Sequence, residues 1–306
     1  MIAFLFPGQG SQFSGMGKDL ADNFSVARLV FEEACDALGF DIARLCFNGS
    51  EDELKLTANT QPAILTTSIA ALRVVEQETD FRPVYAAGHS LGEYSALVCA
   101  GALGFADAVR TVRKRGTFMQ EAVPVGIGAM AAVMGVERAD LEQICSESAQ
   151  GEVVSPANFN SPGQIVIAGH ATAVERAMEL ARQRGAKRAL PLPVSAPFHS
   201  SLMEPAARRL AEVLDDVTVH PFQCPVVGNV KAEPYQEQGL VKSLLTEQVC
   251  APVCWDQSVV EMADLGVSNF IEIGPGKVLS GLVKRIVKGT NVQNVGDVAD
   301  LDKLQS

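Results

Sequence analysis

The chain reads Ala86-Ala87-Gly88-His89-Ser90-Leu91-Gly92-Glu93-Tyr94 between an apolar run at 84–87 and a helix-like run at 93–100. This order predicts a strand, a sharp turn and a helix around a GxSxG pentapeptide. A serine in such a turn takes strained dihedral angles, and a glycine on each side lets neighbouring backbone approach closely. Ser90 is therefore the candidate nucleophile, and an ordinary tight turn is the alternative.

Composition bounds the class of protein. The 306 residues are 47% hydrophobic, which is enough to bury a sizeable core in one large domain or two smaller ones. No apolar run reaches the length of a membrane span, and the apolar start passes into Pro7-Gly8 without a basic leader. The formal charge of −11 argues against nucleic acid or an anionic membrane surface as the main partner. We expect a cytoplasmic protein.

Cysteine usage does not indicate a metal or disulfide framework. Seven cysteines are spread over the chain without a CxxC pair. An odd count of this kind argues against both a disulfide scaffold and a zinc site. Cys250 and Cys254 flank Pro252, but no histidine is near them in the sequence. We therefore predict neither a metal nor another cofactor.

A glycine-rich loop follows the first predicted strand. Residues 2–6 predict a short buried strand that ends in Pro7-Gly8-Gln9-Gly10. The loop lacks the third glycine and downstream acid of a dinucleotide site and the Lys-Ser/Thr pair of a nucleotide-binding loop. Two interpretations of Gln9 remain open: an amide beside Ser90 that donates to an oxyanion, or a residue of a simple turn.

Alternation of short apolar strands with helical patterns predicts a parallel α/β sheet. Helical spacing covers residues 18–38 and 60–78, ahead of the strand that leads to Ser90. After the elbow, one apolar stripe runs along the predicted helix 105–123. Arg115 flanks this stripe on its more apolar side, so it is the better candidate for a partly enclosed cation. A solvated or snorkelling arginine is the alternative, and periodicity alone favours it.

The pattern changes after Val123, where Pro124 and nearby glycines mark a join. The chain then predicts strand, helix, strand, strand, helix and strand at 129–134, 139–149, 153–158, 164–168, 171–184 and 188–191. This βαββαβ order is that of a ferredoxin-like unit, so we predict a small inserted domain that walls a cleft over Ser90. Turn chemistry explains the polar residues that we place in the loop between its middle strands, and a substrate-facing role is the alternative: Asn158, Asn160, Ser161 and Gln164.

Four histidines are candidates for a general base. His199 lies in the proline-bracketed loop 195–201 at the domain join, where a cleft residue is expected. The others lie beside the nucleophile, at a helix start and at the end of a strand-like segment: His89, His170 and His220. His199 is the best placed, with a capping or surface histidine as the alternative.

The last third returns to an α/β pattern. We predict an apolar run at 225–230, helices at 240–249 and 255–265, a strand at 270–273, a helix to residue 287, a strand at 292–295 and a polar tail. Gly274-Pro275-Gly276 opens the helix after the strand at 270–273. Such a helix start is suited to binding an anion.

The combined motifs resemble the malonyl-CoA:acyl carrier protein transacylases of fatty acid synthesis. Six stretches carry the resemblance in the family's order over nearly the whole chain, namely 6–12, 88–95, 114–116, 158–164, 196–199 and 274–279. The resemblance implies an α/β-hydrolase-like large domain at 1–123 and 196–306 with a ferredoxin-like small domain inserted at 124–195. It also implies two partners, malonyl-CoA and the acyl carrier protein, and we expect a monomer.

The resemblance implies covalent catalysis. Ser90 would attack the malonyl thioester after His199 takes its proton, and the malonyl-serine would then pass to the phosphopantetheine thiol of the carrier protein by a ping-pong route. Main-chain N–H groups of Gln9 and Leu91 would hold the oxyanion. The product would serve fatty acid biosynthesis.

Substrate recognition is also implied by the resemblance. Arg115 would pair with the free malonyl carboxylate, which its planar fork suits better than lysine would. The main-chain carbonyl of Gln248 would orient His199 in place of an aspartate. Phe198 before His199 resembles the malonyl-selective form, in which the ring fills the space that an α-methyl group would need.

Two other functions remain open from the sequence. A serine esterase or thioesterase would need an acid aimed at His199, for which Asp215 and Asp216 are the available residues. A catalytically silent carrier-binding domain would not need intact Ser90, His199 and Arg115. Docking of an acidic carrier protein would need a local cationic rim, with these candidates: Lys187, Arg188, Lys277, Lys284 and Arg285.

Overall fold

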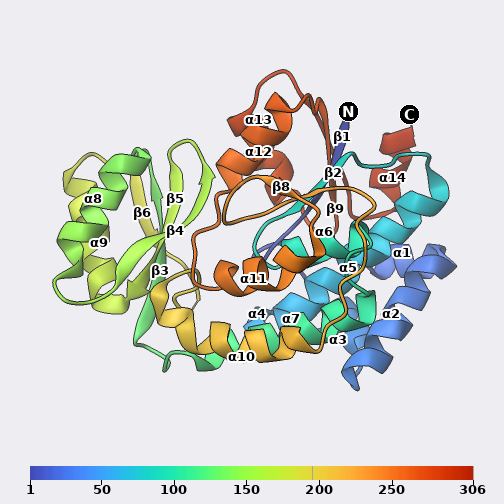
Figure 1. Cartoon of the computed structure of the whole chain (residues 1–306), viewed down its shortest axis with the longest axis horizontal. Coiled ribbons are helices and arrows are strands. Elements are labelled where there is room, and N and C mark those ends of the chain that lie inside the picture. The colour runs from blue at the N-terminus through green and yellow to red at the C-terminus, as the bar shows by residue number, and fades with distance from the viewer. Residues whose placement is uncertain (195, 306) are drawn as a thin grey trace.

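The computed structural model of the chain describes residues 1–194 and 196–305. Ser195 and Ser306, which end the predicted domain ranges 124–195 and 196–306, lie outside the described residues. The described chain forms two sheets that lie beside one another (Figure 1), one with six strands and one with four.

The six-stranded sheet is parallel apart from one edge strand. Its order is β10 (Asn291–Val295), β9 (Asn269–Ile273), β1 (Ile2–Phe6), β2 (Tyr85–Gly88), β7 (Val226–Val227) and β8 (Pro234–Tyr235). Only β8 pairs antiparallel, with β7. The predicted parallel α/β sheet is confirmed. Because β1 and β2 are central and parallel, the glycine-rich loop and the elbow leave the same edge of the sheet.

Helices cover both faces of this sheet. Successive residues of β1 point to opposite faces and are apolar, so both faces have to be buried. Phe4 and Phe6 pack in the larger apolar core, whereas Ala3 and Leu5 pack against helices on the other face. The larger core takes residues from α1 (Lys18–Asn23), α2 (Ser25–Leu38), α3 (Ile42–Asn48), α4 (Glu51–Lys55), α5 (Thr57–Glu78), α6 (Gly92–Cys99), α7 (Phe105–Glu121), α10 (Glu204–Asp215) and α11 (Gln238–Gln248). The opposite face is covered by α12 (Trp255–Asp264) and α13 (Val278–Ile286).

The four-stranded sheet is antiparallel and has the predicted order of elements. These elements are β3 (Gly128–Met134), α8 (Arg138–Ala149), β4 (Val154–Ser161), β5 (Gln164–His170), α9 (Ala171–Gln183) and β6 (Arg188–Pro191), and the strand order is β4-β5-β3-β6. Helices α8 and α9 lie on the side away from the larger sheet (Figure 1). The other face of the sheet, which includes Met130 and Val166, joins the larger core.

The predicted loop placement of four polar residues is wrong, because Asn158, Asn160 and Ser161 belong to β4 and Gln164 begins β5. Strand β4 continues past its predicted end at residue 158, with register shifts in its pairing with β5. The predicted polar tail contains α14 (Val298–Gln305), which follows β10. A short 3-10 turn, Ser201–Met203, precedes α10. Leu301 and Leu304 bury one side of α14, a pattern too short to recognise in the sequence.

Candidate active site

The turn between β2 and α6 has the geometry of a nucleophile elbow. Ser90 has φ 52°, in the left-handed region that favours glycine. A β-carbon on Gly88 would lie 2.0 Å from the main-chain carbon of Gly92, and one on Gly92 would lie 2.2 Å from the main-chain oxygen of Phe6. Both glycines of the pentapeptide are therefore required by close approach of the backbone, as the sequence predicts.

The Gly92→Ala variant is expected to lose about 3 kcal/mol or more of unfolding free energy, because the added carbon overlaps a fixed main-chain oxygen. The matched control is Gly281→Ala in α13, where an added carbon meets nothing within 4 Å. It should gain about 0.5–1 kcal/mol through helix propensity. Urea unfolding followed by circular dichroism measures both. Equal midpoints for the two variants would contradict this account of the elbow.

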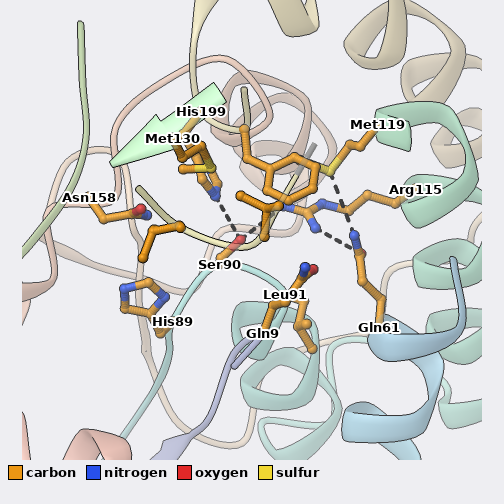
Figure 2. Close-up of a pocket in the computed structure, with 13 residues that line it drawn as sticks. Gln9, Gln61, His89, Ser90, Leu91, Arg115, Met119, Met130, Asn158 and His199 are labelled. Carbon is orange, nitrogen blue, oxygen red and sulfur yellow. Dashed lines mark hydrogen bonds between the residues drawn. The ribbon is translucent and has the colours of Figure 1, made fainter. Parts of the chain in front are cut away.

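Ser90 and His199 meet from segments far apart in the chain. Ser90 Oγ lies 2.8 Å from His199 Nε2 (Figure 2). His199 Nδ1 lies 2.8 Å from the main-chain oxygen of Gln248 and 3.2 Å from that of Ala251. Carbonyl oxygens only accept hydrogen bonds, so the ring carries its proton on Nδ1 and leaves Nε2 to accept from the serine hydroxyl.

The His199 side chain is buried, and its pKa is lowered to about 3. Burial is the larger cause, because it disfavours the charged ring, and the nearby Arg115 cation adds to it. The hydrogen bond to the Gln248 carbonyl acts in the opposite direction. The imidazole is therefore neutral at ordinary pH and is able to accept a proton.

The other histidines make different contacts. His89 turns away from Ser90 (Figure 2), and its Nε2 lies 2.8 Å from Asn160 Oδ1. His170 Nδ1 accepts the main-chain N–H of Val153. His220 is exposed. The structure thus places His199, rather than any other histidine, against Ser90.

Arg115 is an enclosed cation, so the solvated alternative is wrong. Its side chain is only 1% exposed. Nη1 donates to Gln61 Oε1 at 2.8 Å, and Nη2 donates to Ser90 Oγ at 3.2 Å and to Gln248 Oε1 at 3.0 Å. The guanidinium also lies 5.7 Å from the centre of the Tyr94 ring. All these direct partners are neutral.

Two amides hold the strained backbone of Ser90. Asn229 Oδ1 accepts the Ser90 N–H at 2.7 Å, and Gln248 Nε2 donates to the Ser90 carbonyl at 3.0 Å. The buried Glu93 carboxylate accepts hydrogen bonds from both residues, from the main-chain N–H of Asn229 at 3.1 Å and from Gln248 Nε2 at 2.7 Å. Tyr235 donates to the same carboxylate at 3.0 Å. Left-handed geometry persists where several contacts fix it, as they do here.

Gln9 and Leu91 lie on the same side of Ser90 (Figure 2) and line the cavity. The Gln9 side chain donates to Thr57 Oγ1 at 3.4 Å. Within the described residues, the main-chain N–H groups of Gln9 and Leu91 have no protein acceptor. One of these free N–H donors, that of Leu91, stands at the start of α6, and the other lies in the loop after β1. Two such donors suit an oxyanion next to Ser90.

The cavity over Ser90 has a volume of about 110 Å³. The large sheet and its helices supply one side, and Met130 and Asn158 of the small sheet contribute to the other, so the predicted cleft wall is confirmed. The lining residues are Gln9, Gln61, His89, Ser90, Leu91, Arg115, Met119, Met130, Asn158, Leu192, Val194, Phe198 and His199. Among the described lining residues, Arg115 is the cation and the others are neutral or apolar.

The acid that a serine hydrolase would direct at the histidine is not supplied by the predicted residues. Asp215 and Asp216 are both exposed, and His199 Nδ1 faces two main-chain carbonyls instead.

The helix start after Gly274-Pro275-Gly276, predicted to suit an anion, already binds an acidic side chain of the same protein. The Glu272 carboxylate accepts two main-chain N–H groups of α13, at 3.0 and 2.7 Å.

Three residues of the site are not predicted from the sequence motifs, namely Gln61, Asn229 and Glu93. Asn229 follows β7, and the carboxyl ends of neighbouring parallel strands share one edge of the sheet. This rule gave a signal for Asn229. Gln61 lies within the first turns of α5, between Thr60 and Pro62, where no motif gives such a signal.

In residues 1–194 and 196–305, no group of three or more His, Cys, Asp or Glu side chains is arranged to hold a metal ion. The seven cysteines are free thiols. Over the same described ranges, no helix is both long and apolar enough to cross a membrane.

Comparison with known proteins gives a consistent result. The model of the acyl transferase domain family matches residues 3–304. The malonyl CoA-acyl carrier protein transacylase of Bacillus subtilis is 53% identical over 297 residues, covering 97% of this chain and 93% of the relative. A crystal structure of an acyl carrier protein S-malonyltransferase from Vibrio cholerae superposes with a TM-score of 0.97 at 50% identity, with 99% of each chain covered.

A further solved structure contains a partner. It is described as a type II PKS acyl-carrier protein in complex with its malonyl-transacylase, and it superposes with a TM-score of 0.96 at 49% identity, covering 99% of this chain and 98% of that one. Matches of this extent and identity establish the family. The chain is a member of the acyl transferase domain family and belongs to the malonyl CoA-acyl carrier protein transacylases within it.

Proposed function

We propose that this protein moves the malonyl group of malonyl-CoA to the phosphopantetheine thiol of an acyl carrier protein, through a malonyl-serine intermediate, in fatty acid biosynthesis. The observation that carries the proposal is the joint placement of Ser90 Oγ within 2.8 Å of His199 Nε2 and within 3.2 Å of the Arg115 guanidinium. A nucleophile, a base and a carboxylate receptor thus share one cavity.

In the first half-reaction, Ser90 Oγ attacks the thioester carbonyl and its proton passes to His199 Nε2. The C–S bond breaks, and the CoA thiolate takes the proton from His199. In the second half-reaction His199 takes the proton of the phosphopantetheine thiol, and the sulfur attacks the carbonyl carbon of the malonyl-serine. The bond between that carbon and Ser90 Oγ breaks, and the proton returns from His199 to Oγ. The Gln248 carbonyl keeps the ring in the required tautomer throughout.

The tetrahedral intermediates carry a negative oxygen, for which we assign the main-chain N–H groups of Gln9 and Leu91. The free malonyl carboxylate is assigned to Arg115, whose fork matches two carboxylate oxygens. Phe198 lines the same cavity and supports selection of malonyl over bulkier α-substituted groups. The chemistry requires no cofactor or metal.

We assign the larger part of the fold, 1–123 and 196–306, to an α/β-hydrolase-like domain, supported by the parallel sheet and its elbow. We assign 124–195 to a ferredoxin-like insert. The support is the βαββαβ order, the strand order β4-β5-β3-β6 and the two helices on one face.

The carrier protein and a cytoplasmic location are parts of the same proposal. The predicted rim residues are all exposed, but Lys277 pairs with Asp300 at 3.2 Å and Arg285 donates to Gln164 at 2.7 Å. Lys187, Arg188 and Lys284 are thus the more available cations for an acidic carrier.

The rate of malonyl transfer to the carrier protein should fall as the salt concentration is raised, because salt screens exposed charges. A transfer rate that does not change with salt would contradict docking through these cations.

Labelled malonyl-CoA tests the function directly. After a brief incubation and an acid quench, mass spectrometry should find one malonyl group on the peptide that contains Ser90. Addition of phosphopantetheinylated carrier protein should then discharge the adduct onto the carrier thiol. Absence of the adduct would refute the transfer function, and rapid hydrolysis without transfer would indicate a hydrolase.

The dependence of acylation on pH follows from the lowered pKa of His199. With that pKa at about 3, the ring stays neutral as pH falls and becomes protonated only near that value. The kcat/KM for malonyl-CoA should therefore stay flat between about pH 8 and 5, because kcat/KM reports groups of the free enzyme. Stopped-flow or quench assays measure this. An acid limb near the ordinary pKa of histidine would contradict the assignment.

A further inference from the structure

In the resting protein the cation that would bind substrate also touches the nucleophile. Arg115 Nη2 lies 3.2 Å from Ser90 Oγ, and the same oxygen lies 2.8 Å from His199 Nε2. The serine hydroxyl donates to Nε2, because the proton of the ring is on Nδ1. Oγ must therefore accept from Arg115 through a lone pair. The guanidinium of Arg115 therefore makes a charge-assisted hydrogen bond to the lone pair with which Ser90 Oγ would attack a thioester.

Among the described residues, the guanidinium has no anion in direct contact. Its partners are the amide oxygens of Gln61 and Gln248 and the hydroxyl of Ser90. The Glu93 carboxylate is reached only through the Gln248 amide. Arg115 Nε is buried and has no hydrogen-bond partner among the described residues. A buried cation with neutral contacts and an unused N–H attracts a carboxylate strongly.

The same charge acts on the base. Burial is the largest cause of the lowered pKa of His199, and the Arg115 charge and, to a smaller extent, His89 lower it further. Glu93, which faces the site from α6, is bonded to Gln248 between itself and the guanidinium. A carboxylate placed against Arg115 offsets its charge and so strengthens His199 as a base.

We propose that Arg115 restrains Ser90 until a carboxylate-bearing acyl group binds. The substrate carboxylate takes over the guanidinium N–H groups, frees the Oγ lone pair and offsets the charge beside His199. The site then selects malonyl at the step of bond formation as well as by binding. This inference rests on the proposed function, of which it is the selection mechanism.

Splitting the acyl group into two molecules tests the restraint. An acetyl group and a formate ion together carry the carbon and oxygen atoms of malonyl without the bond that joins them. p-Nitrophenyl acetate acetylates Ser90 Oγ, the serine proton passes to His199, and p-nitrophenolate leaves with the electron pair of the broken ester bond. Formate should accelerate this first turnover on the order of tenfold, the size expected for release of one charge-assisted hydrogen bond. Chloride at equal ionic strength should not.

Two arginine variants of α7 provide matched controls. The Arg115→Ala variant should release p-nitrophenolate faster than the wild type without formate and should not respond to formate. The Arg113→Ala variant should behave as the wild type, because Arg113 donates to Ala58 and Asn59, outside the cavity. The Ser90→Ala variant gives the background rate. Formate that slows the wild type or leaves it unchanged overturns the restraint, as does an Arg115→Ala variant that is not faster.

Failure of the inference and failure of the function are separable. The same preparation is treated with labelled malonyl-CoA. A malonyl adduct on Ser90 without any formate effect leaves the transfer function standing and refutes the restraint. No malonyl adduct refutes the transfer function, and the restraint as its selection mechanism falls with it.

Discussion

The Ser90→Ala variant is expected to form no malonyl adduct and to lose about 10⁴–10⁶-fold in transfer rate, as enzymes do when a covalent nucleophile is removed. The double variant Ser90→Ala, His199→Ala should be no slower, because the two side chains act as one unit through their 2.8 Å contact. Quench-flow with labelled malonyl-CoA measures both.

Ser201→Ala is a suitable control for the serine variant, since this exposed serine begins the short 3-10 turn after His199. It should keep the wild-type rate. Malonyl transfer by Ser90→Ala at more than about a hundredth of the wild-type rate would show that the intermediate does not form at Ser90.

The Arg115→Ala variant is expected to lower kcat/KM for malonyl-CoA about 10²–10³-fold, because a buried carboxylate would lose its charged partner. Transfer from acetyl-CoA should not fall, since acetyl has no carboxylate to pair. The measurement is the ratio of kcat/KM for malonyl-CoA to kcat/KM for acetyl-CoA. In the Arg115→Ala variant this ratio should fall to about one or below one.

Arg113→Ala again serves as the control, with the malonyl preference unchanged. An equal loss for malonyl and acetyl in the Arg115→Ala variant would mean that Arg115 supports the elbow or Ser90 in general. It would then not be a receptor for the substrate carboxylate.

Gln248 connects the parts of the site. Its main-chain oxygen accepts from His199, its side-chain oxygen accepts from Arg115, and its amide nitrogen donates to the Ser90 carbonyl. Glu93 accepts from that nitrogen and so fixes which end of the amide faces Arg115. The residue that the family resemblance assigned only to the histidine therefore also orients the cation and the elbow.

Short-range patterns in the chain specify the local part of the protein. The strand, elbow and helix around Ser90 need glycine at positions 88 and 92, because an added β-carbon would lie only 2.0–2.2 Å from neighbouring backbone atoms. A short motif therefore specifies this part of the fold. The alternation of strands and helices likewise determined the parallel sheet, and the βαββαβ order of the second sheet followed from the spacing of its elements. Arg115 was singled out because the periodicity of one helix placed it beside a buried stripe.

Packing of the sheets and helices brings distant residues to Ser90. Gln61 lies in α5, Asn229 in the turn after β7 and Gln248 at the end of α11, and no local pattern relates their positions in the chain. Enclosure of Arg115 needed the same packing, because periodicity gives the face of a helix but not what covers it. Hydrogen bonds between such segments depend on distances that close only when the sheets and helices pack together, and for that reason the site was only partly predictable from its motifs.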